Sequence, residues 1–308
     1  MPIVRLLRPH QWIKNLFVLA ALVFGKQLFN ANSVIIALLG FFAFCLVSSA
    51  VYVLNDLHDR DEDRLHPRKR LRPIASGEVS PNSARMLFAG LVVVGIGGAF
   101  ALGRAFGLVV AGYLVLQLLY TFGFKHAVIL DVICIAVGFV MRAVAGAVLI
   151  AVPISPWLVV CTFTLCLFMG FSKRRCELNA IANGAAGQHR RTLEIYTPDL
   201  LNHMTTLAAG LAIVTFLLYT TDARTKAVFR ESAELLIYTL PIVVYAVFRF
   251  AVLVEHGEVD GPTDVITRDR PFQAAIVLWV LAVLAIIYYG AQLRAMFLGA
   301  QVDPAGMT

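Results

Sequence analysis

Residues 34–54 read VIIALLGFFAFCLVSSAVYVL, and the next nine residues, 55–63, read NDLHDRDED. The first stretch holds 21 residues without a charge, which is about the length of a helix that crosses the hydrocarbon core of a membrane. The second stretch holds four aspartates and one glutamate. This order predicts a membrane-spanning helix whose acidic end lies at the membrane surface.

The whole chain has the composition of a membrane protein. Of its 308 residues, 59% are hydrophobic and 15% are charged, and the mean hydropathy is +0.79, which excludes an ordinary soluble domain. Pro153-Ile154-Ser155-Pro156 divides a long apolar interval into two spans. In chain order, the expected spans are 13–29, 33–54, 86–103, 105–124, two within 131–173, 200–221, 235–253 and 271–293. We therefore predict an all-α polytopic membrane protein with nine transmembrane helices, forming one domain over residues 1–308.

The distribution of Lys and Arg predicts the orientation. With nine spans, the face that receives the N-terminus and the loops near residues 55–85, 125, 173–191 and 249–270 holds 19 of these residues, and the other face holds 6. The richer face is expected to be cytoplasmic. The N-terminal apolar run lacks a cleavage site of small residues, so we expect it to be the first helix. The net charge of +7 follows from this topology and requires no nucleic-acid partner.

The acidic cluster has the spacing of a metal site. If the helix continues past Leu54, then Asn55, Asp59 and Asp63 lie at i, i+4 and i+8 and share one side of it. Oxygen ligands on one face suit Mg²⁺, which keeps other positions for water and substrate phosphates. The alternative is a solvated charge run beside the membrane, but five acidic side chains in nine residues repel one another unless a cation intervenes.

Basic residues follow the acidic cluster directly, among them Lys69 and Arg72, ahead of Pro73 and the turn-like Ser76-Gly77. Acidic and then basic side chains in one loop form the arrangement expected for a metal-bound polyphosphate.

Asp131 and Arg142 lie within the apolar region and are eleven residues apart, close to three helical turns, so they point the same way. Charges at this depth are costly and face the interior of a bundle. They form either a structural polar seam or, for Arg142, a contact to an anionic group below the cytoplasmic mouth.

A second charged cluster, Lys173-Arg174-Arg175-Cys176-Glu177, opens a later cytoplasmic loop, with Lys173 and Glu177 as i, i+4 neighbours. It serves either as an anchor of the positive-inside kind or as an anion contact. Further charged residues of the cytoplasmic loops are Arg190, Arg191, Glu194, Asp264, Arg268, Asp269 and Arg270. We expect all these clusters to gather on one face.

Together these residues resemble a known family. The spacing Asn55-Asp56-x-x-Asp59-x-x-x-Asp63 resembles the first aspartate-rich motif of the UbiA superfamily of intramembrane prenyltransferases. Further motifs resemble the decaprenyl-phosphate phosphoribosyltransferase branch: Arg8-Pro9-His10-Gln11-Trp12-Ile13-Lys14-Asn15, His66-Pro67-x-Lys69-Arg70-x-Arg72-Pro73-Ile74-Ala75-x-Gly77, Tyr120-x-Phe122-Gly123-x-Lys125-His126, Arg142-Ala143-x-Ala145-Gly146, Lys173-Arg174-x-x-Glu177-Leu178 and Arg268-Asp269-Arg270.

The resemblance implies a UbiA-like bundle around a central cavity open to the cytoplasmic face, in the bacterial inner membrane. It implies Mg²⁺-dependent transfer of phosphoribose from phosphoribosyl diphosphate to a polyprenyl phosphate, towards arabinan precursors of the cell wall. The expected partners are these two substrates and the lipid bilayer, with no nucleic acid, and a homo-oligomer is compatible with the sequence.

The resemblance also implies roles for residues. Asp56, Asp59 and Asp63 are expected to be catalytic, and Asn55, Asp59 and Asp63 to hold the metal. The expected substrate-binding residues are Lys14, Lys69, Arg72, Lys125, Arg142, Lys173, Arg174, Glu177 and Arg268. Of these, Lys69 and Arg72 are expected at the diphosphate oxygens. Lys173, Arg174 and Lys125 are expected at the ribose phosphate or the lipid phosphate.

One departure from the superfamily favours this branch. Relatives that use prenyl diphosphates carry a second aspartate-rich motif where this chain has Ser172-Lys173-Arg174-Arg175-Cys176-Glu177. A basic loop suits a phosphate monoester without a metal. The alternatives are a UbiA-type enzyme that moves a prenyl chain to an aromatic acceptor, a secondary transporter with Asp131 and Arg142 on its pathway, and a scaffold.

Overall fold

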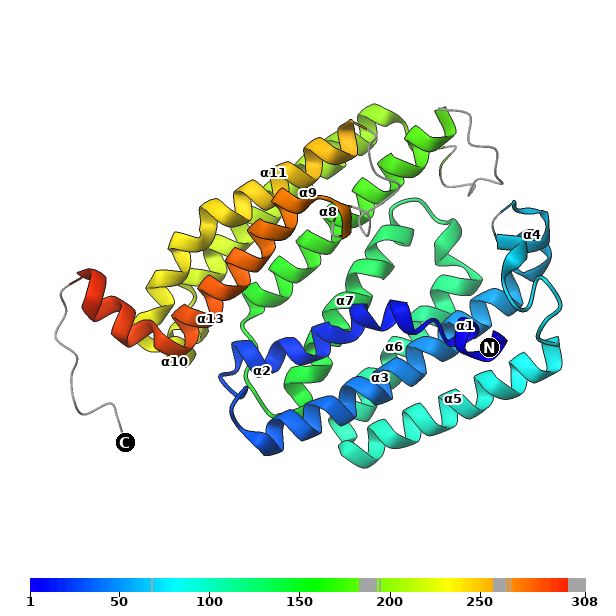
Figure 1. Ribbon diagram of the computed structural model, residues 1–308, viewed down its shortest axis with the longest axis horizontal. Coiled ribbons are helices and arrows are strands. Elements are labelled where there is room, and N and C mark those ends of the chain that lie inside the picture. The colour runs from blue at the N-terminus through cyan, green and yellow to red at the C-terminus, as the bar shows by residue number, and fades with distance from the viewer. Residues whose placement is uncertain (68, 183–192, 194, 257–264, 266, 299–308) are drawn as a thin grey trace. The chain divides into compact units, whose positions relative to one another are not determined.

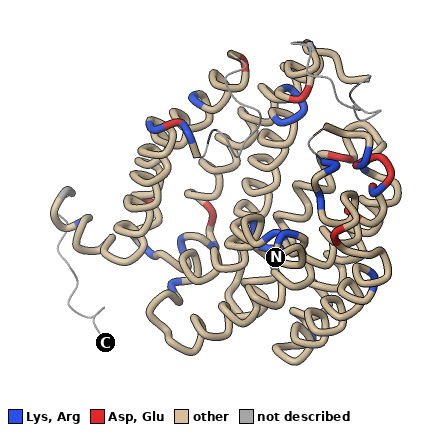
Figure 2. Tube along the Cα trace, turned by 45° about the vertical axis from the view of Figure 1, so that its right-hand side comes forward, with Lys and Arg blue, Asp and Glu red and all other residues tan. Residues whose placement is uncertain are grey.

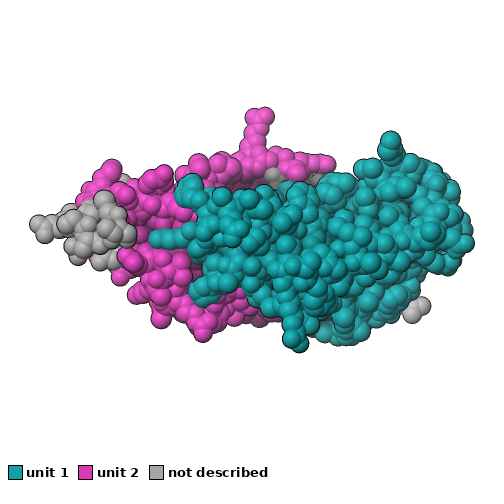
Figure 3. Space-filling view, turned by 90° about the horizontal axis from the view of Figure 1, so that it is seen from below, with its two compact units in different colours: residues 1–153, 181–197 teal, residues 154–180, 198–308 magenta. Residues whose placement is uncertain are grey.

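The structure is a computed structural model, and it describes residues 1–67, 69–182, 193, 195–256, 265 and 267–298. The described residues are helical and contain no strand, as the sequence predicts. They divide into two compact units, one of residues 1–153 and 181–197 and one of residues 154–180 and 198–308 (Figure 3). The expectation of a single domain stays a prediction.

Unit 1 contains the N-terminal helices (Figure 1). In chain order they are α1 (Pro2–Leu7), η1 (Pro9–Leu19), α2 (Ala20–Phe24), α3 (Ala31–His58), α4 (Arg60–Leu65), η2 (Lys69–Leu71), α5 (Pro81–Leu102), α6 (Arg104–Phe122), η3 (Phe124–His126) and α7 (Leu130–Leu149), where η marks a 3-10 helix.

Unit 2 contains the remaining helices. They are α8 (Pro156–Ala182), whose last residues belong to unit 1, then α9 (Pro198–Thr221), α10 (Ala223–Phe229), η5 (Arg230–Thr239), α11 (Leu240–Glu255) and α13 (Arg270–Leu298).

Local sequence explains where the long helices of unit 1 begin. Asn30 precedes α3, and its side chain accepts a hydrogen bond from the backbone N–H of Ser33 at 3.1 Å. Ser80 caps α5 in the same way and is followed by Pro81, a residue favoured in the first helical turn. Helices α3 and α5 pack along each other (Figure 1).

Eight helical stretches are long and apolar enough to cross a membrane in the described part of the chain. They are Ala31–His58, Pro81–Leu102, Arg104–Phe122, Leu130–Leu149, Pro156–Ile181, Pro198–Thr221, Ser232–Glu255 and Arg270–Met296. The chain is therefore a multi-pass integral membrane protein, and these stretches match eight of the nine expected spans.

The remaining expected span, 13–29, is not a single α-helix. It consists mainly of η1 and α2, which together cover Pro9–Phe24. Laid end to end they would reach roughly 30 Å, because a 3-10 helix rises about 2.0 Å per residue against 1.5 Å in an α-helix. That length is close to the thickness of the hydrocarbon core. The count of nine transmembrane helices stays a prediction.

The core of unit 1 is apolar and aromatic. Phe44 and Val47 of α3 pack with Phe106 and Val110 of α6 and with the ring of Tyr113. A smaller apolar cluster lies near the C-terminal end of α3, where Val53 packs with Leu6 and Ile74. This second cluster brings three segments that are distant in sequence to the end of the helix at which the acidic residues 55–63 lie.

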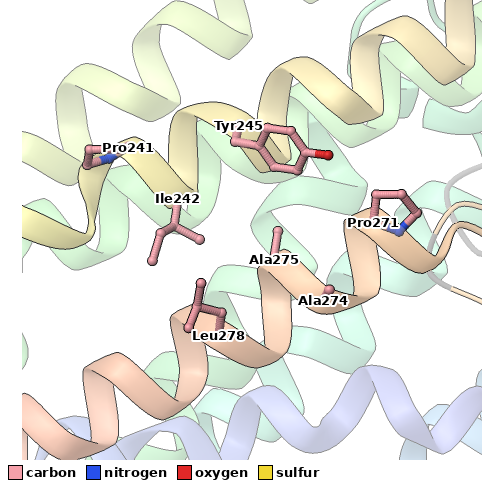
Figure 4. A pocket seen from close by; sticks show the side chains of 7 residues that line it. All are labelled: Pro241, Ile242, Tyr245, Pro271, Ala274, Ala275 and Leu278. Carbon is pink, nitrogen blue, oxygen red and sulfur yellow. The ribbon is translucent and has the colours of Figure 1, made fainter.

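Unit 2 has an apolar groove between α11 and α13, with a volume of about 460 Å³. Figure 4 shows Ile242 and Leu278 facing each other across it. It is lined by Pro241, Ile242, Tyr245, Pro271, Ala274, Ala275 and Leu278. None of these side chains carries a charge, so this groove differs chemically from the charged clusters at residues 55–63 and 173–177. The predicted central cavity stays a prediction.

Candidate functional site

The acidic cluster lies where α3 passes into α4. The backbone N–H of Asp59 donates to the carbonyl of Asn55 at 2.9 Å, and that of Asp63 donates to the carbonyl of Asp59 at 2.8 Å. The helical path therefore continues with only a local departure at Asp59, and Asn55, Asp59 and Asp63 follow one another by helical turns, as predicted. Figure 2 shows acidic and basic residues gathered around this end of the helix.

The N-terminal segment, residues 7–15, is hydrogen-bonded to α3. Ser49 of α3 donates to the carbonyl of Leu7 at 2.8 Å and accepts from the indole N–H of Trp12 at 3.0 Å. Asn15 donates to Ser48 at 2.9 Å. These bonds hold Arg8, which lies between Leu7 and Trp12, against the acidic end of the helix.

Asp56 and Asp63 are the enclosed carboxylates of the cluster, each with 2% of its surface exposed. The contacts of Asp56 come from two arginines. Its Oδ1 accepts from Arg8 Nη2 at 2.6 Å and from Arg72 Nη1 at 3.1 Å. Arg72 Nη1 also donates to Asp63 Oδ2 at 2.7 Å. One guanidinium group thus bridges two carboxylates that are seven positions apart.

Asp59 and Asn55 are met by residues from the end of α6 and from η3. Lys125 Nζ lies 2.5 Å from Asp59 Oδ1. The hydroxyl of Thr121 donates to Asn55 Oδ1 at 2.5 Å. The structure therefore brings Asn55, Asp56, Asp59, Asp63, Arg72 and Lys125 together, and their functional roles stay predictions.

Burial sets the protonation behaviour of Asp63. Desolvation raises the pKa of its carboxyl above the ordinary value, while Arg72, which bonds to it, and Lys69, which is near it, oppose this shift. Lys69 itself is exposed in η2, and Lys14 is half-buried in η1. The nearby charge of Asp56 raises the pKa further, so burial outweighs the positive charge and the net direction is upward.

The four oxygen-bearing side chains, Asn55, Asp56, Asp59 and Asp63, suit a hard divalent cation in kind. The three carboxylates face basic side chains, however, and within the described ranges no three His, Cys, Asp or Glu side chains form a ready metal-binding group. The donor atoms fit such a cation by type. A cation bound to these oxygens would replace contacts that Lys125 or Arg72 makes here.

Asp131 is bonded to Tyr196, which also bonds to a strained residue, Ile129. The hydroxyl of Tyr196 donates to Asp131 Oδ1 at 3.1 Å and accepts from the backbone N–H of Ile129 at 2.7 Å. Ile129 has φ 70°, an unfavourable conformation for a β-branched residue. The contact between Tyr196 and Asp131 links segments 65 residues apart.

Arg142 bonds to groups inside unit 1. Its Nε donates to Asn15 at 2.8 Å, its Nη2 to the hydroxyl of Tyr113 at 2.8 Å and its Nη1 to the carbonyl of Gly138 at 2.8 Å. The guanidinium also lies over the rings of Phe44, Tyr113 and Phe139. These contacts are those of the structural polar seam, one of the two alternatives, and its substrate role stays a prediction.

The second charged cluster lies on α8 in unit 2. Arg174 is 1% exposed and donates to Glu177 Oε2 at 2.6 Å, and Lys173 Nζ lies 3.9 Å from Glu177 Oε1. Arg175 is bonded to Asn179, Asn202 and Glu255. The predicted i, i+4 pair is thus present, with Arg174 as a closer partner of the same carboxylate.

Near the start of α13, Asp269 forms two bonds with Arg249, at 2.7 and 3.2 Å, and accepts from the backbone N–H of Phe272. Hydrogen bonding from Arg249 is the main cause that holds the pKa of Asp269 below its ordinary value. Arg268 is exposed beside this pair. Arg68, Arg190, Arg191, Glu194 and Asp264 lie outside the described residues, and whether all the charged clusters share one face stays a prediction.

Arg8 and Thr121 belong to the site, but the sequence did not predict a role for either residue. Arg8 stood within a recognised motif, but its partner Asp56 is 48 positions away. Thr121 donates to a residue 66 positions away. No local spacing could have revealed either contact.

The helices and the charged cluster define an all-α, multi-pass membrane protein with a polar site at the end of a spanning helix. The chain belongs to the UbiA prenyltransferase family, which it matches over residues 15–262. The family resemblance drawn from the motifs is therefore confirmed.

Three relatives carry the name decaprenyl-phosphate phosphoribosyltransferase. The protein of Corynebacterium glutamicum is 33% identical over 92% of this chain and 86% of its own length. The protein of Mycolicibacterium smegmatis is 32% identical over 93% of this chain and 92% of its own length. The protein of Mycobacterium tuberculosis H37Rv is 32% identical over 94% of this chain and 95% of its own length.

Solved structures share the fold. A UbiA homolog from Archaeoglobus fulgidus bound to DMAPP and Mg²⁺ has a TM-score of 0.71 at 19% identity, over 93% of this chain and 99% of the other. The same homolog bound to GPP and Mg²⁺ has a TM-score of 0.69 over the same shares. These likenesses confirm the predicted UbiA-like helical fold.

Proposed function

We propose that the protein is a polyprenyl-phosphate phosphoribosyltransferase, which transfers 5-phosphoribose from phosphoribosyl diphosphate to a polyprenyl phosphate. The observation that carries this proposal is the end of α8. Glu177 bonds to Arg174 and lies near Lys173. A helix end of this kind suits a phosphate monoester, such as that of the ribose, better than a second metal. The relatives named decaprenyl-phosphate phosphoribosyltransferase support the same reading along most of the chain.

The proposed metal is Mg²⁺, which is named with the solved UbiA homolog. Asn55, Asp59 and Asp63 are the residues proposed to hold it. When bound, Mg²⁺ supplies charge neutralisation for the diphosphate leaving group.

The residues of this chain bind and orient the two substrates. Lys69 and Arg72 bind diphosphate oxygens, and Lys125, which contacts Asp59 here, binds the ribose phosphate or the lipid phosphate. Lys173 and Arg174 bind the ribose phosphate through charge-assisted hydrogen bonds.

The transfer is one displacement at the anomeric carbon. An oxygen of the acceptor phosphate forms the new bond to this carbon, while the bond to the diphosphate oxygen breaks and pyrophosphate leaves with its electron pair. The configuration inverts. Because the acceptor phosphate is already an anion at neutral pH, the reaction needs little help from a general base.

The proposed location is the bacterial plasma membrane, with the site facing the cytoplasm. The excess of Lys and Arg on the loops of that face supports this orientation. The lipid tail of the acceptor then lies in the bilayer among the apolar helices, and the water-soluble donor reaches the site from the cytoplasm.

Release of pyrophosphate tests the proposal. We expect purified protein to release pyrophosphate from phosphoribosyl diphosphate with Mg²⁺ only when a polyprenyl phosphate is added, and to form a lipid that carries phosphoribose. The matched reaction contains geranyl diphosphate and an aromatic acid instead. Product in that reaction, with none from phosphoribosyl diphosphate, would establish the prenyltransferase alternative.

A further inference from the structure

Arg8 has a strained backbone. Its φ and ψ are 51° and 58°, in the left-handed region, and it directly precedes Pro9. A residue other than glycine is uncommon in this region, and a following proline restricts the backbone further. Such conformations persist where surrounding contacts fix them, and they occur often at functional sites.

Two residues of α3 fix the side chain of Arg8. Asp56 accepts from its Nη2 at 2.6 Å, and the ring of Tyr52 lies under its guanidinium, 5.1 Å from the ring centroid. Tyr52 and Asp56 are four residues apart and so lie on the same side of the helix. Together they set both the direction and the plane of the guanidinium group.

Arg8 and Arg72 converge on a single oxygen. Both donate to Asp56 Oδ1, so the distance between their two donor nitrogens cannot exceed the sum of the two hydrogen-bond lengths. Asp56 is 2% exposed, whereas the side chains of Arg8 and Arg72 are 21% and 27% exposed. The carboxylate is therefore more enclosed than the two arginine side chains that contact it, and both arginines keep some exposed surface.

The charges near this pair favour an anion. Asp56 and Asp63 balance Arg8 and Arg72 in this structure. If Asp63 takes part in holding a divalent cation, only Asp56 remains to offset two guanidinium groups. Neighbouring guanidinium groups match the oxygens of phosphate and diphosphate.

We propose that Arg8 is a phosphate-binding residue of this site, acting beside Arg72, and that Asp56 and Tyr52 are positioning residues that hold its guanidinium in place. The ligand is a phosphate or diphosphate oxyanion. The proposal rests on the proposed function only for which substrate carries that anion, the water-soluble donor or the lipid acceptor.

The test replaces Arg8 without changing the backbone requirement. Arg8→Asn is suitable because asparagine tolerates the left-handed region better than most residues. Arg5→Asn is the matched control, since Arg5 lies in the same segment and forms an exposed ion pair with Glu78. The probes are inorganic pyrophosphate with Mg²⁺, which represents the donor, and farnesyl phosphate, which represents the lipid acceptor, each titrated by calorimetry in detergent.

We expect Arg8→Asn to weaken pyrophosphate binding about tenfold or more, because it loses charge-assisted hydrogen bonds. Arg5→Asn should bind as the wild type does. Arg8→Lys should fall between the two, since lysine keeps the charge but lacks the planar group that stacks on Tyr52.

The positioning roles are tested by coupling. If Asp56 acts through the arginines, Asp56→Asn should weaken pyrophosphate binding less in the Arg8→Asn background than in the wild type. Tyr52→Leu should behave in the same way. Thermal unfolding of each variant reports separately on folding, so lower stability with unchanged affinity of the folded protein would identify a purely structural Arg8 and overturn the proposal.

The two probes separate the sources of the anion. Loss of farnesyl phosphate binding alone would assign Arg8 to the lipid acceptor, and loss of pyrophosphate binding to the donor. Unchanged affinity for both probes, or no binding of either to the wild type, would overturn the proposal. If the wild type binds pyrophosphate through Arg8 but does not bind phosphoribosyl diphosphate, the proposed function fails while the role of Arg8 stands.

Discussion

The charged cluster at the α3–α4 junction and the charged cluster on α8 are built in opposite ways. At the junction, Arg8 and Asp56 are 48 positions apart, and Lys125 and Asp59 are 66 positions apart. On α8, Arg174 and Glu177 are three positions apart on one helix. The first arrangement exists only in the folded unit 1, whereas the pairing of Arg174 with Glu177 follows from their spacing along one helix.

This difference has a consequence for function. A site assembled by tertiary contacts holds several groups in fixed mutual positions, which a transfer reaction requires. A pair of charged residues on one helix, such as Arg174 and Glu177, can present charge to a phosphate. It fixes the positions of fewer groups relative to one another. We therefore expect loss of the proposed metal-binding carboxylates at the junction to affect turnover, and loss of Lys173 on α8 to affect affinity.

The largest effect is expected from Asp59→Asn or Asp63→Asn. Each removes a proposed metal-binding carboxylate, and the lost stabilisation of the leaving group, worth several kcal/mol, should lower turnover by about a hundredfold or more. Pyrophosphate release measures the change, and thermal unfolding confirms that the variant is folded. Asp61→Asn is the control, because Asp61 also belongs to α4 but its side chain is 89% exposed. An equal loss in Asp61→Asn would mean that total charge matters and alignment does not.

The next effect tests the tertiary contacts of unit 1. A Cβ at Gly146 would collide with the backbone carbonyl oxygen of Val18, so Gly146→Ala must push η1 away from α7. We expect a loss of stability of about 1–3 kcal/mol, seen as a lower unfolding temperature in detergent. At Gly97 nothing lies within 4 Å of an added Cβ. Gly97→Ala should therefore be neutral or slightly stabilising, and equal losses in both variants would contradict the close packing.

A moderate effect on affinity is expected at α8. Lys173→Ala should raise the KM for phosphoribosyl diphosphate about tenfold, the value of one hydrogen bond to a charged group. Because KM reports binding only when chemistry is slow, donor binding should be measured directly as well. Lys226→Ala removes an exposed lysine of the same unit and serves as the control. Unchanged donor affinity with weaker binding of polyprenyl phosphate would move Lys173 to the acceptor.

The smallest effect concerns pH. Because Arg249 holds the pKa of Asp269 below its ordinary value of 3.8, the pair stabilises the fold fully above that value and loses this contribution as the pH falls through the lowered pKa. Asp269→Asn should therefore lower the unfolding temperature slightly at pH 7, and the difference from the wild type should shrink in strong acid. Arg249→Gln should show the same trend. A difference that stays constant with pH would contradict the ion pair.

Periodicity in the sequence predicted much of the fold and part of the site. Eight spans, the helical alignment of Asn55, Asp59 and Asp63, and the Lys173–Glu177 pair all depend on spacing along one helix. The course of residues 9–24 was harder to predict, because its 3-10 geometry accompanies bonds from Trp12 and Asn15 to α3. Composition cannot reveal such contacts.

The partners of charged residues were the other part that the sequence could not supply. Arg142 was expected to face the interior, and it does, but Asn15 and Tyr113, which bind it there, come from other segments. The strained backbone of Ile129 likewise depends on surroundings that include Tyr196. These features arise from three-dimensional packing, so only the structure could reveal them.

The order of synthesis gives the ion-pair network at the junction a further meaning. Arg8 leaves the ribosome long before Asp56, Asp56 before Arg72, and Arg72 before Lys125. The bridge from Arg72 to Asp56 and Asp63 therefore cannot close until the loop after α4 has been translated, and Asp59 gains its lysine only once α6 is complete. During biogenesis the carboxylates at the acidic end of α3 therefore lack some of their basic partners. The site is assembled only when unit 1 is complete.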